Sequence, residues 1–189
     1  MNIYFDCEFT GLQKDTTLIS IGLIAEDGRK FYAELNDYDK TQVNEWIQDN
    51  VVANLSYNEK EHYMPKESIE KCKSYACKSD KSHVGRLLGI WLGQFDKIQF
   101  VSDVSHYDFV LLVDLLAGHA FNLPENVSPS CHDINQDIAA HYMVPDWFAF
   151  DMNREELLAD CDVVVKGLKH NALYDAKVIK ELYKIVGGN

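Results

Sequence analysis

The sequence of 189 residues lacks several features that mark membrane or secreted proteins. No apolar run approaches the roughly 20 residues that a membrane-spanning helix requires. The N-terminal residues show no basic stretch followed by an apolar one, so no secretory signal is visible. The five cysteines form no CxxC pair, and an odd number fits poorly with a complete disulfide framework. We therefore expect a cytoplasmic protein with reduced thiols and no membrane association.

Two kinds of phosphate-binding signal are also missing. The sequence contains neither GxxxxGK[ST] nor GxGxxG, so P-loop and Rossmann interpretations lack their glycine-rich loop. The net charge of -12 argues against indiscriminate coating of nucleic acid, because such a field repels phosphate. The charge is uneven, however, since residues 133–162 carry eight acids against Arg154 alone.

Basic residues gather in two groups, and each group is either a solvated face or a local funnel for phosphate. The first group comprises Lys71, Lys73, Lys78, Lys81 and Arg86, and the second comprises Lys166, Lys169, Lys177, Lys180 and Lys184.

The hydropathy pattern predicts an α/β fold in one domain, residues 1–189, with a sizeable core. Three strands joined by short turns suggest an antiparallel meander, and two later strands alternate with helices. We therefore expect a mixed five-stranded sheet flanked by helices. Residues 56–82 are polar and lysine-rich, and we interpret them as a possible surface insertion. The expected strands lie near 3–9, 18–24, 30–35, 97–103 and 128–134, and the expected helices near 41–55, 84–95, 107–116, 134–141 and 171–186.

The stretch "YFDCEFTGL" places two acids in an apolar strand, where charge is costly. Residues i and i+2 of a strand share a face, so Asp6 and Glu8 point together, while Cys7 is a small buried residue on the opposite face. A hard divalent cation, Mg2+ or Mn2+, would neutralise such a pair of oxygen ligands. An Asp-x-Glu at a solvent-facing turn is the competing interpretation.

Two further stretches contain candidate groups. In "FVSDVSHYDFVLL", Asp108 opens a helix, where an acid often does no more than complement the helix dipole, and Asp103 is the better candidate for a turn or cap residue. In "HNALYD", His170 precedes the last helix and Asp175 lies about one turn inside it, with Asn171 as the expected N-cap. Each signal is weak alone, but their order is informative.

Together, "DCEFTGL", "SHYDFVLL" and "HNALYD" resemble the three motifs of the DEDDh (DnaQ-like, ribonuclease T-like) 3'-5' exonuclease superfamily. The run "LISIGLIAEDGRKFYAEL" is similar to the mycobacterial-type and phage 3'-5' exoribonucleases of that superfamily. The resemblance spans nearly the whole chain and implies a ribonuclease H-like fold. One departure is Val104, which stands where the second motif of many relatives has an asparagine.

The resemblance implies a catalytic and metal-binding set of Asp6, Glu8, Asp108 and Asp175, with His170 as general base. Two divalent ions about 3.5–4 Å apart suit phosphodiester hydrolysis. Asp6 would bridge them, Glu8 and Asp175 would complete the shell of one ion, and Asp108 would serve the other. The substrate-binding candidates are Phe9, Thr10, Gly11 and Leu12 in the first-motif loop, and Tyr107 as a stacking residue.

The resemblance implies a 3'-5' exoribonuclease that releases nucleoside 5'-monophosphates from single-stranded or 3'-overhanging nucleic acid, with RNA preferred. A DNA exonuclease of the proofreading or repair type, an inactive nucleic-acid-binding domain of the same fold, and a phosphatase of small substrates are the alternatives. Because relatives similar to ribonuclease T often form homodimers, the group from Lys71 to Arg86 could reach a partner's site in a homodimer. This dimer is a hypothesis of the resemblance alone.

Overall fold

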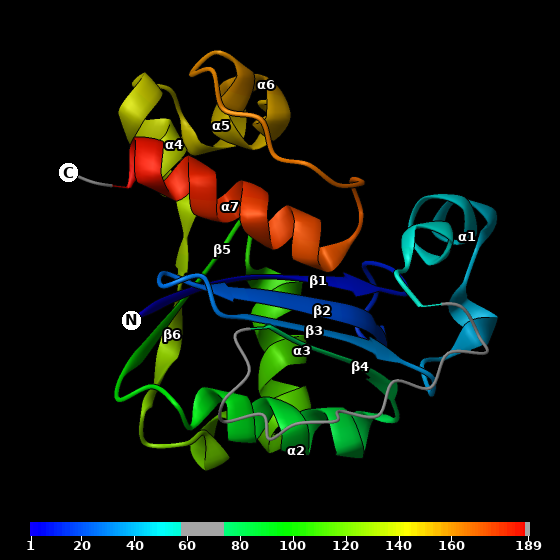
Figure 1. Ribbon diagram of the computed structural model, residues 1–189. Coiled ribbons are helices and arrows are strands. Elements are labelled where there is room, and N and C mark those ends of the chain that lie inside the picture. Colours follow the sequence, from blue (N-terminus) through cyan, green and yellow to red (C-terminus); the bar gives the residue numbers. More distant parts are fainter. Residues whose placement is uncertain (58–73, 188–189) are drawn as a thin grey trace.

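A six-stranded mixed sheet forms the centre of the computed structural model, which describes residues 1–57 and 74–187 (Figure 1). The strand order is β4-β3-β2-β1-β5-β6. The strands are β1 (Asn2–Phe9), β2 (Leu18–Ala25), β3 (Lys30–Leu35), β4 (Ser74–Ser79), β5 (Ile98–Ser102) and β6 (Val127–Asp133).

The antiparallel meander of β1, β2 and β3 is confirmed, and β5 and β6 extend the sheet in parallel on the β1 side. The expectation of five strands is wrong, because β4 adds a parallel edge strand beside β3. Tyr75 and Cys77 of β4 alternate into the core, although lysines on either side obscure this pattern in the sequence. Of the proposed insertion at 56–82, residues 58–73 lie outside the described residues, so there the insertion stays a prediction, whereas Ser74–Ser79 form β4 of the sheet.

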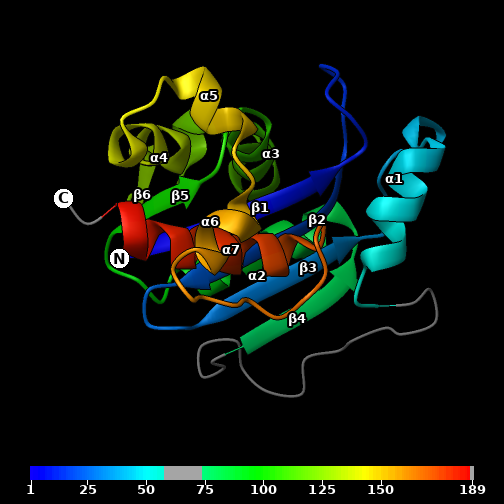
Figure 2. The same cartoon turned by 90° about the horizontal axis from the view of Figure 1, so that it is seen from above.

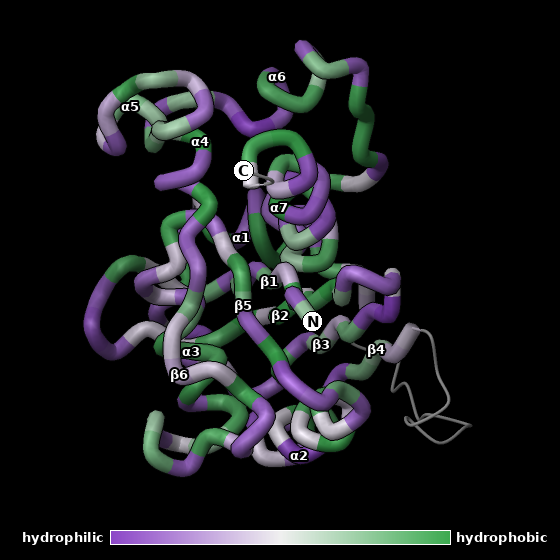
Figure 3. The backbone as a smooth tube through the Cα atoms, turned by 90° about the vertical axis from the view of Figure 1, so that its left-hand side faces the viewer, coloured by the Kyte–Doolittle hydropathy of each residue, from purple (hydrophilic) through white to green (hydrophobic). Residues whose placement is uncertain are grey.

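Helices cover both faces of the sheet, and no described helix is long and apolar enough to cross a membrane (Figures 1 and 2). The two faces hold separate hydrophobic clusters, one under α2 and α3 and the other under α4 to α7. In Figure 3 hydrophobic residues (green) recur along the strands and helices, while hydrophilic residues (purple) are frequent in outer loops. The helices are α1 (Glu45–Asn50), α2 (Lys81–Leu92), α3 (His106–Ala117), α4 (Ile134–Tyr142), α5 (Asp146–Asp151), α6 (Arg154–Ala159) and α7 (Ala172–Val186).

Local capping explains where the helix beside the site begins. Asn171 is the N-cap of α7, as predicted, and its side chain accepts a hydrogen bond from the backbone N–H of Tyr174. The helix ends at Val186, with Gly187 as its C-cap. The helix expected over 41–55 is shorter than predicted, because only α1 is α-helical and short 3-10 helices flank it, η1 (Lys40–Gln42) and η2 (Val52–Asn54).

Gly22 of β2 lets α7 approach the sheet very closely. A Cβ atom at Gly22 would lie 2.3 Å from the backbone nitrogen of Leu173 and 2.4 Å from the carbonyl carbon of Ala172. Gly22 is also the antiparallel neighbour of Asp6 on β1. The missing side chain therefore allows the first turn of α7 to pack directly beside the acidic part of β1.

Candidate active site

A cavity of about 540 Å³ collects all five predicted catalytic residues. Its walls come from β1, the start of α3, the segment from α5 to α6, and the beginning of α7 with the residues before it. The lining residues that bear on the chemistry are Asp6, Glu8, Phe9, Asp103, Asp108, Phe150, Arg154, Glu155, Lys169, His170 and Asp175.

The alternation of β1 places its two acids on the face that α7 covers. Tyr4, on the same face, packs against α7, whereas Ile3, Phe5 and Cys7 belong to the cluster on the opposite face. The expectation that Cys7 is a buried residue of the opposite face is confirmed. Asp6 and Glu8 thus point toward α7 across a short gap.

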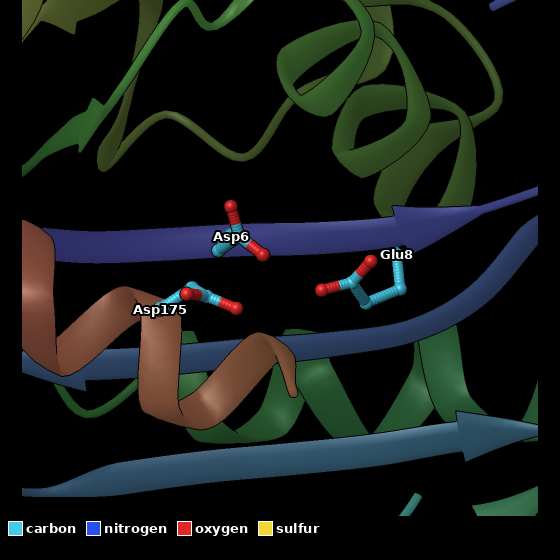
Figure 4. Close-up of side chains that lie close together, drawn as sticks. All are labelled: Asp6, Glu8 and Asp175. Carbon is cyan, nitrogen blue, oxygen red and sulfur yellow. The ribbon is translucent and has the colours of Figure 1, made fainter. Parts of the chain in front are cut away.

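Asp175 meets these two acids from the first turn of α7 (Figure 4). The carboxylates of Asp6, Glu8 and Asp175 each offer an oxygen, and these oxygens lie within 4.8 Å of one another. Oδ2 of Asp175 is buried, and no described residue gives it a hydrogen-bond partner. A buried carboxylate oxygen without a donor is costly unless a cation occupies the space that it faces.

Asp108 lies at the same cavity but outside this compact trio. It sits in the first turn of α3 and is 7% exposed. Its Oδ1 accepts a hydrogen bond of 2.9 Å from the backbone N–H of Cys7, so β1 itself fixes the position of the carboxylate. The structure therefore brings all four acids together as three plus one.

Crowding and burial hold these acids toward their neutral forms. Burial, with Asp175 and Asp108 nearby, raises the pKa of Glu8 to about 8. Burial raises the pKa of Asp108 to about 7 and that of Asp175 to about 7, and it raises the pKa of Asp6 well above its usual value together with repulsion from Asp108. Repelling acids that must share one cavity become stable as anions when a divalent cation lies between them.

His170 lies on the cavity wall directly before α7. Burial and the nearby Lys169 lower the pKa of His170, so its imidazole is neutral at pH 7 and can accept a proton. The ring of Trp46 on α1 contacts it edge-on, with 5.2 Å between the centroids. Trp46 is 56% exposed, so its ring lies against His170 at the surface and not in the core.

Asp103 lies in the bend after β5, as expected for a turn residue, but it is not the N-cap of α3, and its carboxylate forms an ion pair. The guanidinium of Arg154 donates from Nε to Oδ2 at 2.6 Å and from Nη2 to Oδ1 at 2.9 Å. The carboxylate that accepts the backbone N–H groups of Val104 and Ser105 is Asp133. Arg154, the sole lysine or arginine of residues 133–162, thus neutralises a fifth acid of the cavity.

Of the predicted substrate-binding residues, Phe9 lines the cavity, whereas Thr10, Gly11, Leu12 and Tyr107 are not among its lining residues. Tyr107 stacks on Phe9 at a centroid distance of 5.6 Å and donates its hydroxyl to the carbonyl of Leu12. Thr10 is buried, and its hydroxyl hydrogen-bonds to Thr17 and neighbouring polar groups. Gly11 has a left-handed φ of 146°, and Leu12 is 75% exposed. Thr10, Gly11 and Leu12 thus form a short loop after β1, to which Tyr107 of α3 is hydrogen-bonded.

The first basic group is only partly described. Lys71 and Lys73 lie outside the described residues. Lys78 forms an ion pair with the buried Glu34, and Lys81 forms one with Asp114. The homodimer in which this group reaches a partner's site stays a hypothesis.

Comparisons with known proteins agree with the motifs. No protein-family model matches the chain. Two 3'-5' exoribonucleases from strains of Mycobacterium tuberculosis are 27% identical over 136 residues, which cover 72% of this chain and 73% of each relative.

Solved structures with the same fold include Pop2p of S. pombe in its Mg2+- and Mn2+-bound form, at a TM-score of 0.58 and 15% identity over 97% of this chain and 82% of that chain. A 3'-exonuclease solved for 3'-end recognition of a histone mRNA stem-loop has a TM-score of 0.63 at 12% identity, over 98% of this chain and 63% of that chain. A full-length 3'-exonuclease has a TM-score of 0.61 at 12% identity, over 98% of this chain and 82% of that chain.

The sheet and its flanking helices define a ribonuclease H-like α/β fold, as these structures share it. The resemblance to the DnaQ-like 3'-5' exonuclease superfamily, first seen in three short motifs, is confirmed by the curated relatives and the solved structures together.

Proposed function

We propose that this protein is a metal-dependent 3'-5' exoribonuclease that releases nucleoside 5'-monophosphates from single-stranded or short RNA. The observation that carries the proposal is the convergence of four carboxylates and one neutral histidine, from three separate motifs, on one cavity. The names of the M. tuberculosis relatives support 3'-5' polarity and RNA as substrate. The histone mRNA complex of a protein with this fold supports a nucleic-acid 3' end as the ligand.

The donor set suits Mg2+ or Mn2+. Asp6, Glu8 and Asp175 would hold one cation, and Asp108, set apart on α3, would serve a second. The raised pKa values and the unpartnered Oδ2 of Asp175 support cation binding, and so does the Mg2+- and Mn2+-bound Pop2p structure. Bound divalent cations would activate a water molecule and stabilise the charge that develops on the phosphorus and on the leaving 3' oxygen.

His170 would act as the general base. Its lowered pKa keeps the imidazole unprotonated at neutral pH, so a ring nitrogen can take the proton of the attacking water. His170 has a φ of 61°, and the buried Ala172 begins α7 two residues later. The backbone of His170, the proposed general base, is therefore anchored by the start of α7. The ring of Trp46 also contacts the imidazole edge-on.

Substitution of the trio tests the proposal most simply. Asp6→Asn and Asp175→Asn should each abolish release of mononucleotides from a labelled single-stranded RNA in Mg2+ or Mn2+, and EDTA should abolish it in the wild type. Asp160→Asn, an exposed acid outside the cavity, is the matched control and should be fully active. Parallel digestion of a DNA oligomer of the same sequence separates RNA from DNA preference. Normal activity in both trio variants would overturn the proposal.

A further inference from the structure

Phe150, at the rim of the cavity, has no role in the chemistry described above. It lies on α5, lines the cavity, and is nevertheless 59% exposed. Its neighbours Trp147 and Phe148 contact each other, with 5.9 Å between their centroids, whereas Phe150 has no ring partner within residues 1–57 and 74–187. Exposure of a large aromatic surface is unfavourable in water unless a ligand covers it.

The backbone that carries Phe150 is held firmly. Nη1 of Arg154 donates to the carbonyl of Ala149 at 2.6 Å and to that of Met152 at 2.8 Å, so one guanidinium clamps the chain on both sides of Phe150. The same guanidinium is fixed to Asp103 and to Oδ1 of Asn135. A ring on such a fixed backbone loses little conformational entropy when a flat ligand stacks on it.

The charges of the cavity favour base stacking over charge attraction as a source of affinity for an oligonucleotide. Seven acids line it, and its lysine and arginine side chains, Arg154 and Lys169, are paired with Asp103 and Glu155. Protein cations therefore give a phosphate backbone little attraction here. Affinity for an oligonucleotide must come from the bound metal ions and from apolar contact with the bases, each stacked base contributing about 1–3 kcal/mol.

We propose that Phe150 is a substrate-binding residue on which a nucleobase of the RNA stacks as its 3' end enters the cavity. The inference rests on the proposed exoribonuclease function and adds a named stacking surface to it. Phe9 also lines the cavity, but Tyr107 already stacks on its ring. The ring of Phe150 is therefore more accessible to a nucleobase.

The test compares the wild type with Phe150→Ala, Phe150→Trp and Phe148→Ala. Phe148 is the matched control, since it is on the same helix, is 48% exposed and does not line the cavity. The probes are a single-stranded RNA hexamer and three derivatives with one abasic nucleotide at the first, second or third position from the 3' end. We measure kcat/KM in Mn2+ and, in the Asp6→Asn background, binding by fluorescence anisotropy.

Phe150→Ala should lower kcat/KM and affinity for the hexamer by about 5- to 150-fold, the loss expected for one stacked base. One of the three abasic derivatives should bind the wild type as weakly as the intact hexamer binds Phe150→Ala, and its affinity should fall no further in Phe150→Ala. Phe150→Trp and Phe148→Ala should stay within about twofold of the wild type. An equal loss on all four probes, or no loss, would overturn the stacking role. If the wild type cleaves none of the probes, the proposed activity fails, whereas the anisotropy measurements still decide whether Phe150 holds a base.

Discussion

Replacement of Gly22 by alanine would place a methyl group against the first turn of α7. The new Cβ would lie 2.3–2.4 Å from backbone atoms of Ala172 and Leu173, whereas ordinary contacts begin near 3.4 Å. Helix backbone and strand backbone do not yield as a flexible side chain would, so α7 must move outward by about 1 Å. Such overpacking costs about 1–3 kcal/mol of unfolding free energy. Because Asp175 is carried on this turn, a shift of this size should lower kcat about 10²-fold.

Urea unfolding followed by circular dichroism measures the first effect, and release of mononucleotides from RNA measures the second. Gly89→Ala is the matched control, because the nearest atom to its new Cβ would be a flexible methyl of Leu116 at 3.8 Å. Within α2 this change should stabilise the protein by about 0.5–1 kcal/mol and leave activity intact. If Gly22→Ala unfolds at the wild-type urea concentration and cleaves RNA at the wild-type rate, the close approach of α7 does not position Asp175.

Three further outcomes are expected. His170→Ala should lower kcat by about 10²–10⁴-fold with Mn2+ affinity unchanged by calorimetry, and a pH-rate profile identical to that of the wild type would exclude its role as base. In EDTA the folded state keeps protons on Glu8, Asp108 and Asp175 up to pKa values of about 8, 7 and 7, while the unfolded chain releases them near pH 4. Their contribution to stability therefore falls as pH rises from about 4 to 8. Excess Mg2+ should reverse this fall in stability, as measured by urea titration. A stability in EDTA that rises with pH over that range would contradict the crowding of these acids. Val104 has a left-handed φ of 51°, so Val104→Asn should raise the unfolding free energy by about 1 kcal/mol, and a lower urea midpoint would show that the strain is absent.

Local patterns in the sequence account for much of the site. Alternation along β1 suffices to put Asp6 and Glu8 on one face, and the Asn171 cap fixes where α7 begins and hence where Asp175 lies. The order of the three motifs then supplied the fold and the site through the family resemblance. Residues near a strong local signal were therefore predictable.

The features that the sequence did not predict depend on contacts between distant segments. Asp103 and Arg154 are 51 residues apart, and nothing near Asp103 distinguishes an ion-paired acid from a cap. The β4 strand is six residues long, and its buried face appears only when β3 pairs with it. The role of Gly22 is visible only in the structure, because α7 packs against it. The division of the acids into three and one also required the structure, since Asp108 is positioned by the backbone of Cys7.

Anomalous diffraction from a crystal soaked in MnCl2 tests the central claim most directly. We expect a manganese peak in the space enclosed by the carboxylates of Asp6, Glu8 and Asp175, with a second peak on the side of Asp108. An anomalous map without a peak among these four acids, or a manganese ion bound elsewhere while they remain empty, would contradict the assignment of a metal-dependent nuclease.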